Sequence, residues 1–585
     1  MLQRRLRRYL ALPLALLLIE GTALLLASRP AFGRPEAHTP SPHDRHARTT
    51  RRGGAAAKHR DGGKRSHKQH RGVASSRDTE LARPTPTHSP ASPVRPVLTP
   101  APDAEPRLAS LQTQIASILG DRPLSRTRVG VQVMTARDGQ ILFDYNSDRL
   151  FNPASNTKIL ATAAALSELG PDYRYRTTLH GPLPDDDGVI HGDVELRGSG
   201  DPSLSTLDMA DLAHDLAARG VTRIEGDIVV DGRYHDPGAP DRVSTEQALF
   251  LNRNTYAIRV SPTSPNKPAT LSIDPATEYI QLRSKVTTVE RKKTRLRVDV
   301  SREGERLIVT VRGRVHQSSD AVIRHRIGEG SVYAVALLRR MLGDFGVLVT
   351  GGVRRAHVAG DVSVLAEHLS QPLADICRIS NKDSNNFVAD VIFKTLGGAR
   401  YGGAPSLDKG RRAVDELMEP IGISPGDYRI INGSGLTHEN RITPSILTRL
   451  LRHLYFDLAV APEFLASLSV GGVDGTTRNR FRGTDAVGLV RAKTGTLSGV
   501  SALSGYVGDG GDVLIFSILV EGVRHSRLQA VRRAQVRMVQ AMLRYIRAGG
   551  QLKSVPSAPD APVADPEEQR DFEGDGDDNT EAGGE

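Results

Sequence analysis

Residues 155–169, SNTKILATAAALSEL, form the segment that most restricts how this chain can fold. Alanine, leucine and isoleucine fill most positions after Lys158, and Gly170 and Pro171 follow the last of them. The run predicts a buried helix that ends at Leu169, because glycine and proline are typical just beyond a helix. Ser155 stands at the start of this helix, and Lys158 lies one turn later on the same face.

The pair of Ser155 and Lys158 has two interpretations. In the first, Ser155 caps the helix and Lys158 is a solvated lysine. In the second, Ser155 is a nucleophile and Lys158 is its base, since burial and the positive end of a helix both favour a neutral amine. The pattern alone does not decide, because Ser264–Lys267 repeats it. Pro265 and Pro268 prevent a regular helical turn there, so we interpret the second copy as a loop.

Two later motifs make the catalytic interpretation specific. Ser384-Asn385-Asn386 precedes an amphipathic segment, and Lys493-Thr494-Gly495-Thr496 lies in a predicted strand before a hairpin with the turn GDGG. Ser-x-x-Lys, Ser-x-Asn and Lys-Thr-Gly in this order are the signature of penicillin-binding proteins and class A β-lactamases. For Ser384 a role as helix N-cap stays open beside the catalytic one, and for Lys493 an exposed position on the strand stays open.

Length and spacing indicate a large insertion. A chain of 585 residues predicts two or more domains, and about 230 residues separate Ser155 from Ser384. The short apolar runs LRVDVSR, RLIVTVRG and TLSID in this gap predict strands. The other informative segments are LRGSGDPSLS (196–205), IEGDIVVDGRYHD (224–236), LNRNTYAIRVSP (251–262), NGSGLTHENRITP (432–444) and GGVDGTTRNRF (471–481).

Taken together, these motifs resemble the D-alanyl-D-alanine carboxypeptidase/endopeptidase family of low-molecular-mass, class C penicillin-binding proteins, over about residues 106–548. The sequence departs from the family pattern at Asn432, where Asp is commoner, and at Thr437, where Ser is commoner. The resemblance implies an α/β fold, a transpeptidase-like sandwich of an antiparallel sheet flanked by helices. It divides the chain into a catalytic domain of residues 106–178 and 363–548 and a mainly-β inserted domain of residues 179–362.

The resemblance also implies a mechanism for cleaving peptidoglycan stem peptides. Ser155 attacks the carbonyl of the penultimate D-alanine, Lys158 is the general base, and Ser384 relays the proton to the leaving amine. Lys493 raises the positive potential that helps keep Lys158 neutral, and Asn386 orients Lys158 and the substrate amide. β-Lactams are expected as covalent inhibitors, and neither a metal nor another cofactor is needed.

The remaining implied roles concern the strand of Lys493. The backbone N–H groups of Ser155 and Thr496 form the oxyanion hole. Thr494 and Thr496 bind the terminal carboxylate of the substrate, and Gly495 leaves space for substrate beside the strand.

Asp231, at the end of the segment DIVVD, has two interpretations. It faces a cationic group on the stem peptide, such as the diaminopimelate amine, or it caps a turn.

Three functions are compared: a serine D,D-peptidase (carboxypeptidase, endopeptidase or both), a serine β-lactamase on the same fold, and a non-catalytic peptidoglycan-binding module. The third predicts loss of a catalytic residue, and none is lost. The second leaves the inserted region unexplained.

Both ends of the chain differ from its body. Residues 1–33 have a basic start, an apolar run and a small-residue site, as in an export signal or membrane anchor. We therefore expect the protein to be exported, either to the periplasm or to the outer face of the cytoplasmic membrane. Residues 34–105 are a basic linker, predicted disordered, that suits anionic envelope polymers or membrane rather than nucleic acid. Residues 549–585 are an acidic, disordered tail. Cys377 is the single cysteine and is interpreted as a buried apolar residue.

Overall fold

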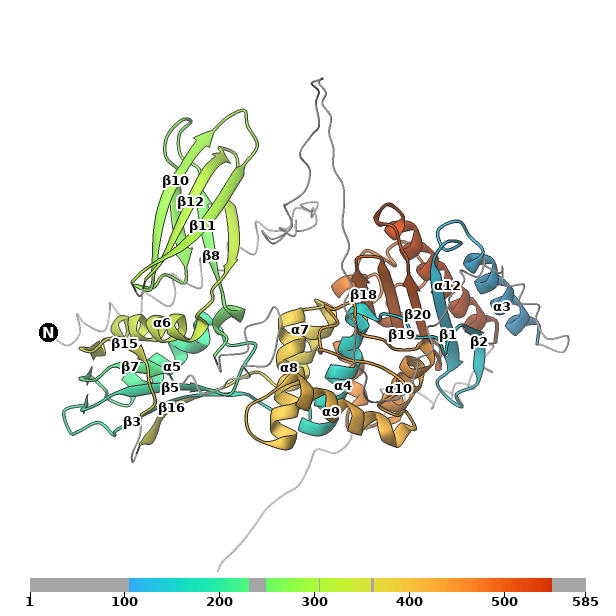
Figure 1. Cartoon of the computed structure of the whole chain (residues 1–585), viewed down its shortest axis with the longest axis horizontal. Coiled ribbons are helices and arrows are strands. Elements are labelled where there is room, and N and C mark those ends of the chain that lie inside the picture. Colours follow the sequence, from blue (N-terminus) through green and yellow to red (C-terminus); the bar gives the residue numbers. More distant parts are fainter. Residues whose placement is uncertain (1–104, 231–248, 305, 359–361, 550–585) are drawn as a thin grey trace, which may run out of the picture. The chain divides into compact units, whose positions relative to one another are not determined.

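The computed structural model describes residues 105–230, 249–304, 306–358 and 362–549. Its largest sheet has six antiparallel strands in the order β17-β18-β19-β20-β1-β2 (Figure 1). The strands are β1 (Arg128–Thr135), β2 (Ile141–Tyr145), β17 (Ser469–Val470), β18 (Val490–Leu497), β19 (Val500–Asp509) and β20 (Asp512–Glu521). The hairpin predicted after Lys493 is confirmed.

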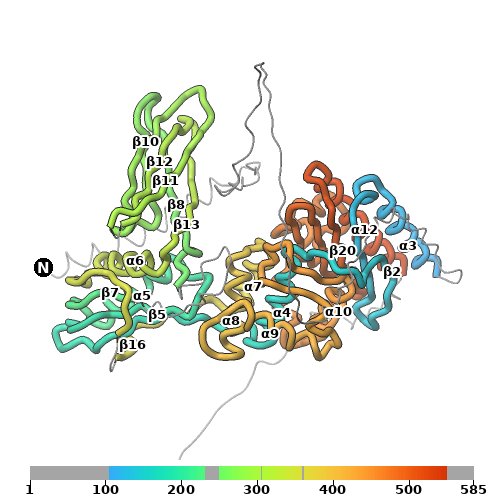
Figure 2. Tube along the Cα trace, viewed as in Figure 1, coloured from blue at the N-terminus to red at the C-terminus, as the bar shows by residue number. Residues whose placement is uncertain are grey.

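Helices cover both faces of this sheet, as expected for a sandwich. Figure 2 shows the first helix of the described chain beside the last, and β1 pairs with β20 although nearly 400 residues separate them in sequence. The first face packs on α3 (Pro106–Leu119) and α12 (Leu528–Gly549). On the other face α10 (Pro444–Phe456) packs on β1, β19 and β20. The core on this face is shared with α4 (Thr157–Leu169), α7 (Leu373–Lys382), α8 (Asn386–Tyr401), α9 (Leu407–Met418) and α11 (Ala461–Ser467).

The central strands are apolar on both sides because both faces are covered. Along β20, Leu514 and Phe516 belong to the core under α12, whereas Ile515 and Leu519 belong to the core under α4. Helix α4 is buried along its length up to Leu166 and ends at Gly170, whose φ of 82° is the left-handed conformation that glycine adopts without strain. The predicted buried helix is therefore confirmed.

Residues between the two parts of this sandwich form further sheets. A five-stranded sheet has the order β15-β7-β5-β3-β16 and packs on two helices, α5 (Thr206–Ala218) and α6 (Gly330–Asp344). Its strands are β3 (Arg176–Gly181), β5 (Val194–Gly198), β7 (Ile228–Val230), β15 (Val353–Arg355) and β16 (Ser363–Leu369). β3 and β16 pair with each other. The division proposed from sequence, after residues 178 and 362, cuts β3 and falls at the start of β16.

Three smaller sheets complete this region. One has the order β14-β6-β4, with β4 (Val189–Ile190), β6 (Arg223–Ile224) and β14 (Leu348–Val349). Another has the order β10-β12-β11, with β10 (Ile280–Val289), β11 (Arg295–Glu303) and β12 (Arg306–His316). The last has the order β13-β8-β9, with β8 (Thr255–Ser261), β9 (Thr270–Asp274) and β13 (Ala321–Arg326). All three strands predicted from sequence in this region are present, and the second Ser-x-x-Lys copy is a loop in which Lys267 N donates to Ser264 O.

Several predictions from the sequence lie outside the described residues. They are the signal or anchor, the basic linker except for its last residue, the acidic tail beyond Gly549, and Asp231. Cys377 is fully buried in the core under α4, as interpreted. Within the residues that the structure describes, no helix has the length and apolar character needed to cross a bilayer.

Candidate active site

Ser155 lies on a short 3-10 turn, η1 (Ala154–Asn156), immediately before α4. The turn is fixed against the middle of the sheet, because Asn156 Nδ2 donates to Ser504 Oγ on β19 at 2.7 Å. Ser504 Oγ in turn donates to Ser517 Oγ on β20 at 2.9 Å. Ala154 has a φ of 46°, an uncommon conformation for a residue with a side chain. The half-buried Ser155 is thus held by a constrained backbone.

Lys158 is completely buried one turn after Ser155. Its Nζ lies 3.1 Å from Ser155 Oγ and 2.8 Å from Asn386 Oδ1, and it also donates to the carbonyl oxygen of Ser434. Burial lowers the pKa of Lys158 to about 7, and the carboxylate of Asp390 opposes this shift. The interpretation of Lys158 as a solvated lysine is therefore wrong.

The three contacts of Lys158 determine where the two N–H groups and the lone pair of a neutral amine point. Asn386 Oδ1 and Ser434 O are carbonyl oxygens, which only accept hydrogen bonds. A neutral amine has two N–H groups, and these two oxygens take both of them. The nitrogen lone pair is left for the third neighbour, the Ser155 hydroxyl, which is the one partner able to donate a proton.

Ser384 and Asn386 reach the same place from the turn between α7 and α8. Ser384 has a φ of 56°, and Asn386 begins α8. The N-cap of α8 is Asn385, whose Oδ1 accepts from Val388 N at 3.1 Å. The alternative that Ser384 is merely this helix cap is therefore wrong. Its hydroxyl instead accepts from Lys493 Nζ at 2.9 Å.

Lys493 is also fully buried, on β18, so it is not an exposed strand lysine. Its Nζ donates to Ser384 Oγ and to the carbonyl of Thr494 at 3.0 Å. Burial lowers the pKa of Lys493 well below its usual range, and the nearby Lys158 and Arg480 lower it further. Burial is likewise the main cause of the low pKa of Lys158. From the sequence, a positive charge on Lys493 was expected to help keep Lys158 neutral. That charge is not the leading cause of the low pKa of Lys158.

Beyond Lys493, one edge of β18 is free of strand pairing within the described chain. β19 pairs along one side of β18, whereas β17 pairs only with Arg491 and Ala492 on the other. On this stretch Thr494 Oγ1 donates to Thr476 Oγ1 at 2.8 Å, and Arg532 Nη2 donates to Thr496 Oγ1 at 3.1 Å. The backbone groups of an unpaired edge are available to a ligand.

Gly495 is required by packing within the protein. A Cβ at this position would lie 2.6 Å from Pro153 O and 3.2 Å from Ala154 Cβ. Those atoms belong to the turn that carries Ser155. The absence of a side chain at Gly495 lets β18 approach the Ser155 turn. This role differs from the one inferred from sequence, in which Gly495 leaves space for the substrate.

Four residues of this site were not singled out from sequence. Ser434 contributes a backbone carbonyl, and Asp390 Oδ1 holds that segment by accepting from Ser434 N at 2.7 Å. Arg532 contacts Thr496, and Arg480 donates to Gln535 Oε1 at 3.2 Å behind it. Burial, with the nearby Arg532, lowers the pKa of Arg480 to about 9. Asp390 lies one turn after Asn386 on α8, a spacing that sequence reasoning can detect.

The sandwich and the Ser–Lys–Ser–Lys cluster define the class as a penicillin-binding-type serine hydrolase. Residues 111–542 match the D-Ala-D-Ala carboxypeptidase 3 (S13) family, and the chain belongs to that family. It is 31% identical over 442 residues to the D-alanyl-D-alanine carboxypeptidase of Actinomadura sp. (strain R39), covering 71% of this chain and 82% of that protein.

Two solved structures share the fold. The crystal structure of penicillin binding protein 4 from Haemophilus influenzae has a TM-score of 0.62 and 22% identity, covering 74% of this chain and 98% of the other. A second structure of that protein, complexed with a β-lactam, has a TM-score of 0.60, 22% identity and the same coverage.

Proposed function

We propose that this serine D,D-peptidase of peptidoglycan acts through an acyl-enzyme on Ser155, with Lys158 as its base. The observation that supports this most is the environment of Lys158, a buried amine with two carbonyl acceptors and one hydroxyl. Family membership supports the reaction class, since its members are D-Ala-D-Ala carboxypeptidases.

In the proposed acylation, Ser155 Oγ attacks the carbonyl carbon of the penultimate D-alanine while its proton moves to Lys158 Nζ. The negative oxygen of the tetrahedral intermediate binds the backbone N–H groups of Ser155 and Thr496. The C–N bond then breaks, and the proton that Lys158 Nζ took from Ser155 passes to the leaving amine through Ser384, whose Oγ lies 2.9 Å from Lys493 Nζ. Water later attacks the ester and releases the shortened peptide.

The leaving group carries a carboxylate next to its amine, and we assign this carboxylate to Thr494 and Thr496. Arg532 contacts Thr496, and Arg480 is close enough to Arg532 to lower its own pKa. Among the described residues Arg532 Nε has no hydrogen-bond partner. Two guanidinium groups behind the threonines therefore favour an anion at this end of the site.

The pH dependence of acylation follows from the state of Lys158. Only the neutral amine accepts the Ser155 proton, and its pKa is about 7. The second-order rate constant for acylation by benzylpenicillin should rise with pH, pass its midpoint near pH 7 and then level off. Stopped-flow measurements between pH 5 and 9 check this, and a rate that falls through neutral pH would contradict a lysine base.

Changing Asp390 to asparagine should move this midpoint to lower pH. The carboxylate raises the pKa of Lys158, so removing its charge lowers that pKa further. The amide oxygen of asparagine still accepts from Ser434 N, which keeps the segment in place. Asp408→Asn, at an exposed ion pair on α9, is the matched control and should leave the profile unchanged. A midpoint that stays or rises in Asp390→Asn would exclude this electrostatic role.

The remaining question about the reaction is which amine leaves. A carboxypeptidase releases D-alanine from a pentapeptide, and an endopeptidase releases a second stem peptide from a crosslink. Incubation with purified pentapeptide and crosslinked muropeptides, followed by mass spectrometry, distinguishes them, and we expect cleavage after a D-alanine in either case. Cleavage of neither substrate, together with rapid hydrolysis of penicillin, would identify a β-lactamase.

The location and further partners are proposals as well. Export, through the segment 1–33, would place the enzyme with its peptidoglycan substrate. Contact of the basic segment 34–105 with anionic envelope polymers or membrane follows from its charge alone. β-Lactams are proposed as covalent inhibitors, supported by the β-lactam complex of the Haemophilus influenzae protein.

A further inference from the structure

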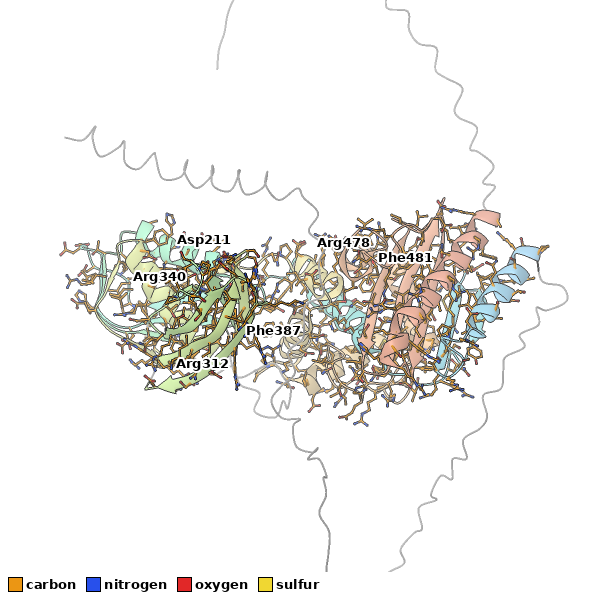
Figure 3. All side chains as sticks on the ribbon, turned by 90° about the horizontal axis from the view of Figure 1, so that it is seen from above. Asp211, Arg312, Arg340, Phe387, Arg478 and Phe481 are labelled. Atoms are coloured by element: carbon orange, nitrogen blue, oxygen red, sulfur yellow. The ribbon has the colours of Figure 1, made fainter. Side chains whose placement is uncertain are left out.

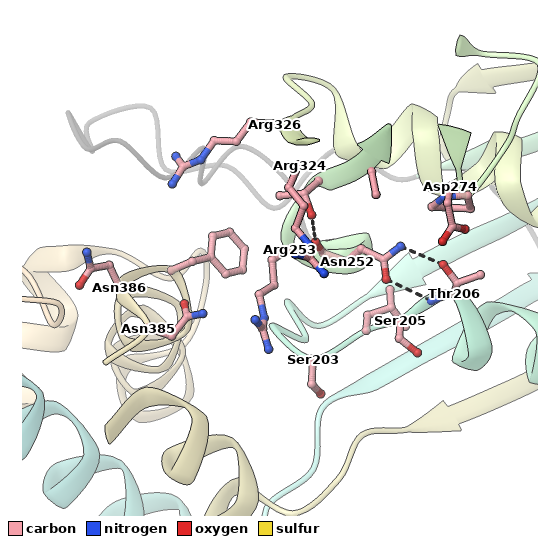
Figure 4. A pocket seen from close by; sticks show the side chains of 15 residues that line it. Ser203, Ser205, Thr206, Asn252, Arg253, Asp274, Arg324, Arg326, Asn385 and Asn386 are labelled. Carbon is pink, nitrogen blue, oxygen red and sulfur yellow. Dashed lines mark hydrogen bonds between the residues drawn. The ribbon is translucent and has the colours of Figure 1, made fainter. Parts of the chain in front are cut away.

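A polar pocket of about 620 Å³ lies beside Asn386 and is not used by the proposed chemistry (Figure 4). This volume is within the usual range for ligand pockets, roughly 300–1,000 Å³. One wall is the start of α8, with Asn385, Asn386 and Phe387. Phe387, labelled in Figure 3, stacks edge-on against Phe250 with ring centroids 5.1 Å apart.

The opposite wall is one face of the sheet β13-β8-β9. Arg324 pairs across with Ala257 and Arg326 with Thr255, and Ala257 also pairs with Asp274. Directly paired residues point to the same face, and all five line the pocket. The alternate residues Tyr256 and Ile258 are buried on the other face. Strand register therefore brings Arg324 and Arg326 to this pocket.

A third arginine, Arg253, enters the pocket from the turn η2 (Leu251–Arg253). Asn252, Arg253 and Asn254 have φ values of 50°, 58° and 54°, a left-handed run that arginine rarely adopts. The turn is fixed to the segment that carries Leu204 and Thr206. Asn252 Nδ2 donates to Thr206 Oγ1 at 2.8 Å, and its backbone N donates to Leu204 O at 2.8 Å. A constrained backbone thus holds Arg253 in the pocket, between its turn and the start of α8 (Figure 4).

The charge of the pocket favours an anion. Three arginines and one carboxylate, Asp274, line it, which gives a formal charge of 3 − 1 = +2 for the described lining residues. Within the part of the chain that the structure describes, neither Arg253 nor Arg324 makes a hydrogen bond or ion pair through its guanidinium group. Two such groups facing one pocket suit a carboxylate, which the planar guanidinium binds through paired hydrogen bonds.

The position of the pocket indicates which part of a substrate reaches it. In the proposed reaction the leaving group lies at Thr494 and Thr496, on β18. Asn386 contacts Lys158 from α8, and the pocket begins at Asn386. A donor that passes Asn386 therefore enters the pocket with its acyl part, the part that becomes attached to Ser155.

We infer that this pocket binds a carboxylate of the donor peptide upstream of the scissile bond, through Arg253 and Arg324. In a stem peptide such a group is the free α-carboxylate of the γ-linked glutamyl residue, two residues before the D-alanine that acylates the enzyme. The inference rests on the proposed function. It predicts that the enzyme prefers stem peptides whose glutamyl carboxylate is free over those in which it is amidated.

The test uses two synthetic pentapeptides that differ only at this group, as carboxylate or carboxamide. Both carry lysine instead of diaminopimelate at the third position, so that the side chain of this residue has no carboxylate. The full-length protein should cleave the carboxylate peptide with a kcat/KM about tenfold higher, the effect of one charge-assisted contact. Arg253→Ala and Arg324→Ala should each reduce this ratio toward one. Arg219→Ala, an exposed arginine at the end of α5, should keep it.

Several outcomes would overturn the inference. Equal cleavage of both peptides by the unmodified protein excludes it and leaves the proposed function intact. Cleavage of neither peptide, with no acylation of Ser155 by penicillin, means that the proposed function itself fails. A ratio that responds to Arg253→Ala only in peptides with diaminopimelate would assign the pocket to that residue's carboxylate. If Arg253→Ala or Arg324→Ala loses binding to a phosphate polymer while the ratio of kcat/KM values for the two peptides is unchanged, the pocket binds wall polymers instead. A thermal melt of each variant identifies loss of folding. Arg253→Lys keeps the positive charge, so it should keep part of the preference for the carboxylate peptide.

Discussion

Replacing Lys158 with methionine is expected to lower the rate of acylation of Ser155 by about 10³-fold, within the range measured for loss of a general base. Methionine has a similar length and fits an apolar environment. It provides no lone pair to accept the Ser155 proton, and it leaves the oxygens of Asn386 and Ser434 without their donor. The rate of labelling by a fluorescent penicillin measures the effect, and a thermal melt shows that the variant is folded.

Lys267→Met is the matched control for this variant. It changes the lysine of the second Ser-x-x-Lys copy, which lies in a loop with Ser264, and it should acylate at the rate of the unmodified protein. If Lys158→Met also acylates at that rate, Lys158 is not the base. The proton must then go elsewhere, with Lys493 through Ser384 the next candidate.

Replacing Gly495 with alanine should reduce acylation by about 100-fold, the effect expected when a reacting group is displaced by about 1 Å. The new Cβ would lie 2.6 Å from Pro153 O, so either β18 or the Ser155 turn must move. The same overlap should lower the thermal stability, because packed interiors do not absorb an added carbon without strain. Acylation rate and melting temperature are both measured.

Gly343→Ala serves as the control for this substitution. Gly343 lies within α6 with open space around its Cβ position, and alanine favours helix, so stability should stay or rise there. If Gly495→Ala melts as the unmodified protein does and loses only substrate affinity, the space at Gly495 belongs to the substrate. That result would restore the role inferred from sequence.

The sequence predicted those parts of the site that depend on side-chain type and spacing. Ser155 and Lys158 are three residues apart on a helix, and Ser384, Asn386 and Lys493 belong to motifs with fixed residue types. The structure brings all five together. The buried helix, the hairpin and the two-sided sheet were predictable because their patterns of apolar residues are strong.

What sequence reasoning missed has identifiable physical causes. The contact from Ser434 to Lys158 is made by a backbone carbonyl, which no residue type encodes. Ser384 and Asn385 are both good helix caps, so only the backbone geometry shows that Asn385 is the cap. Helix α5 was not predicted, although Ser205 and Asp208 form a capping box at its start.

The electrostatics of the site could not be predicted from sequence, because they depend on which groups are buried and which come together in the folded chain. The low pKa of Lys158 comes mainly from burial, with Asp390 acting against it. Burial at this position depends on the packing of α4 against α8 and the sheet, which a sequence pattern does not measure. The arginines Arg480 and Arg532 come from segments more than 50 residues apart and meet only in the folded chain.

The most direct test of the acyl-enzyme at Ser155 is the mass of the protein after a short incubation with benzylpenicillin. We expect one added penicilloyl group, mapped by peptide sequencing to Ser155, and none in Ser155→Ala, which should remain folded. A protein that stays unlabelled, or an adduct that forms equally in Ser155→Ala, would contradict the proposed mechanism.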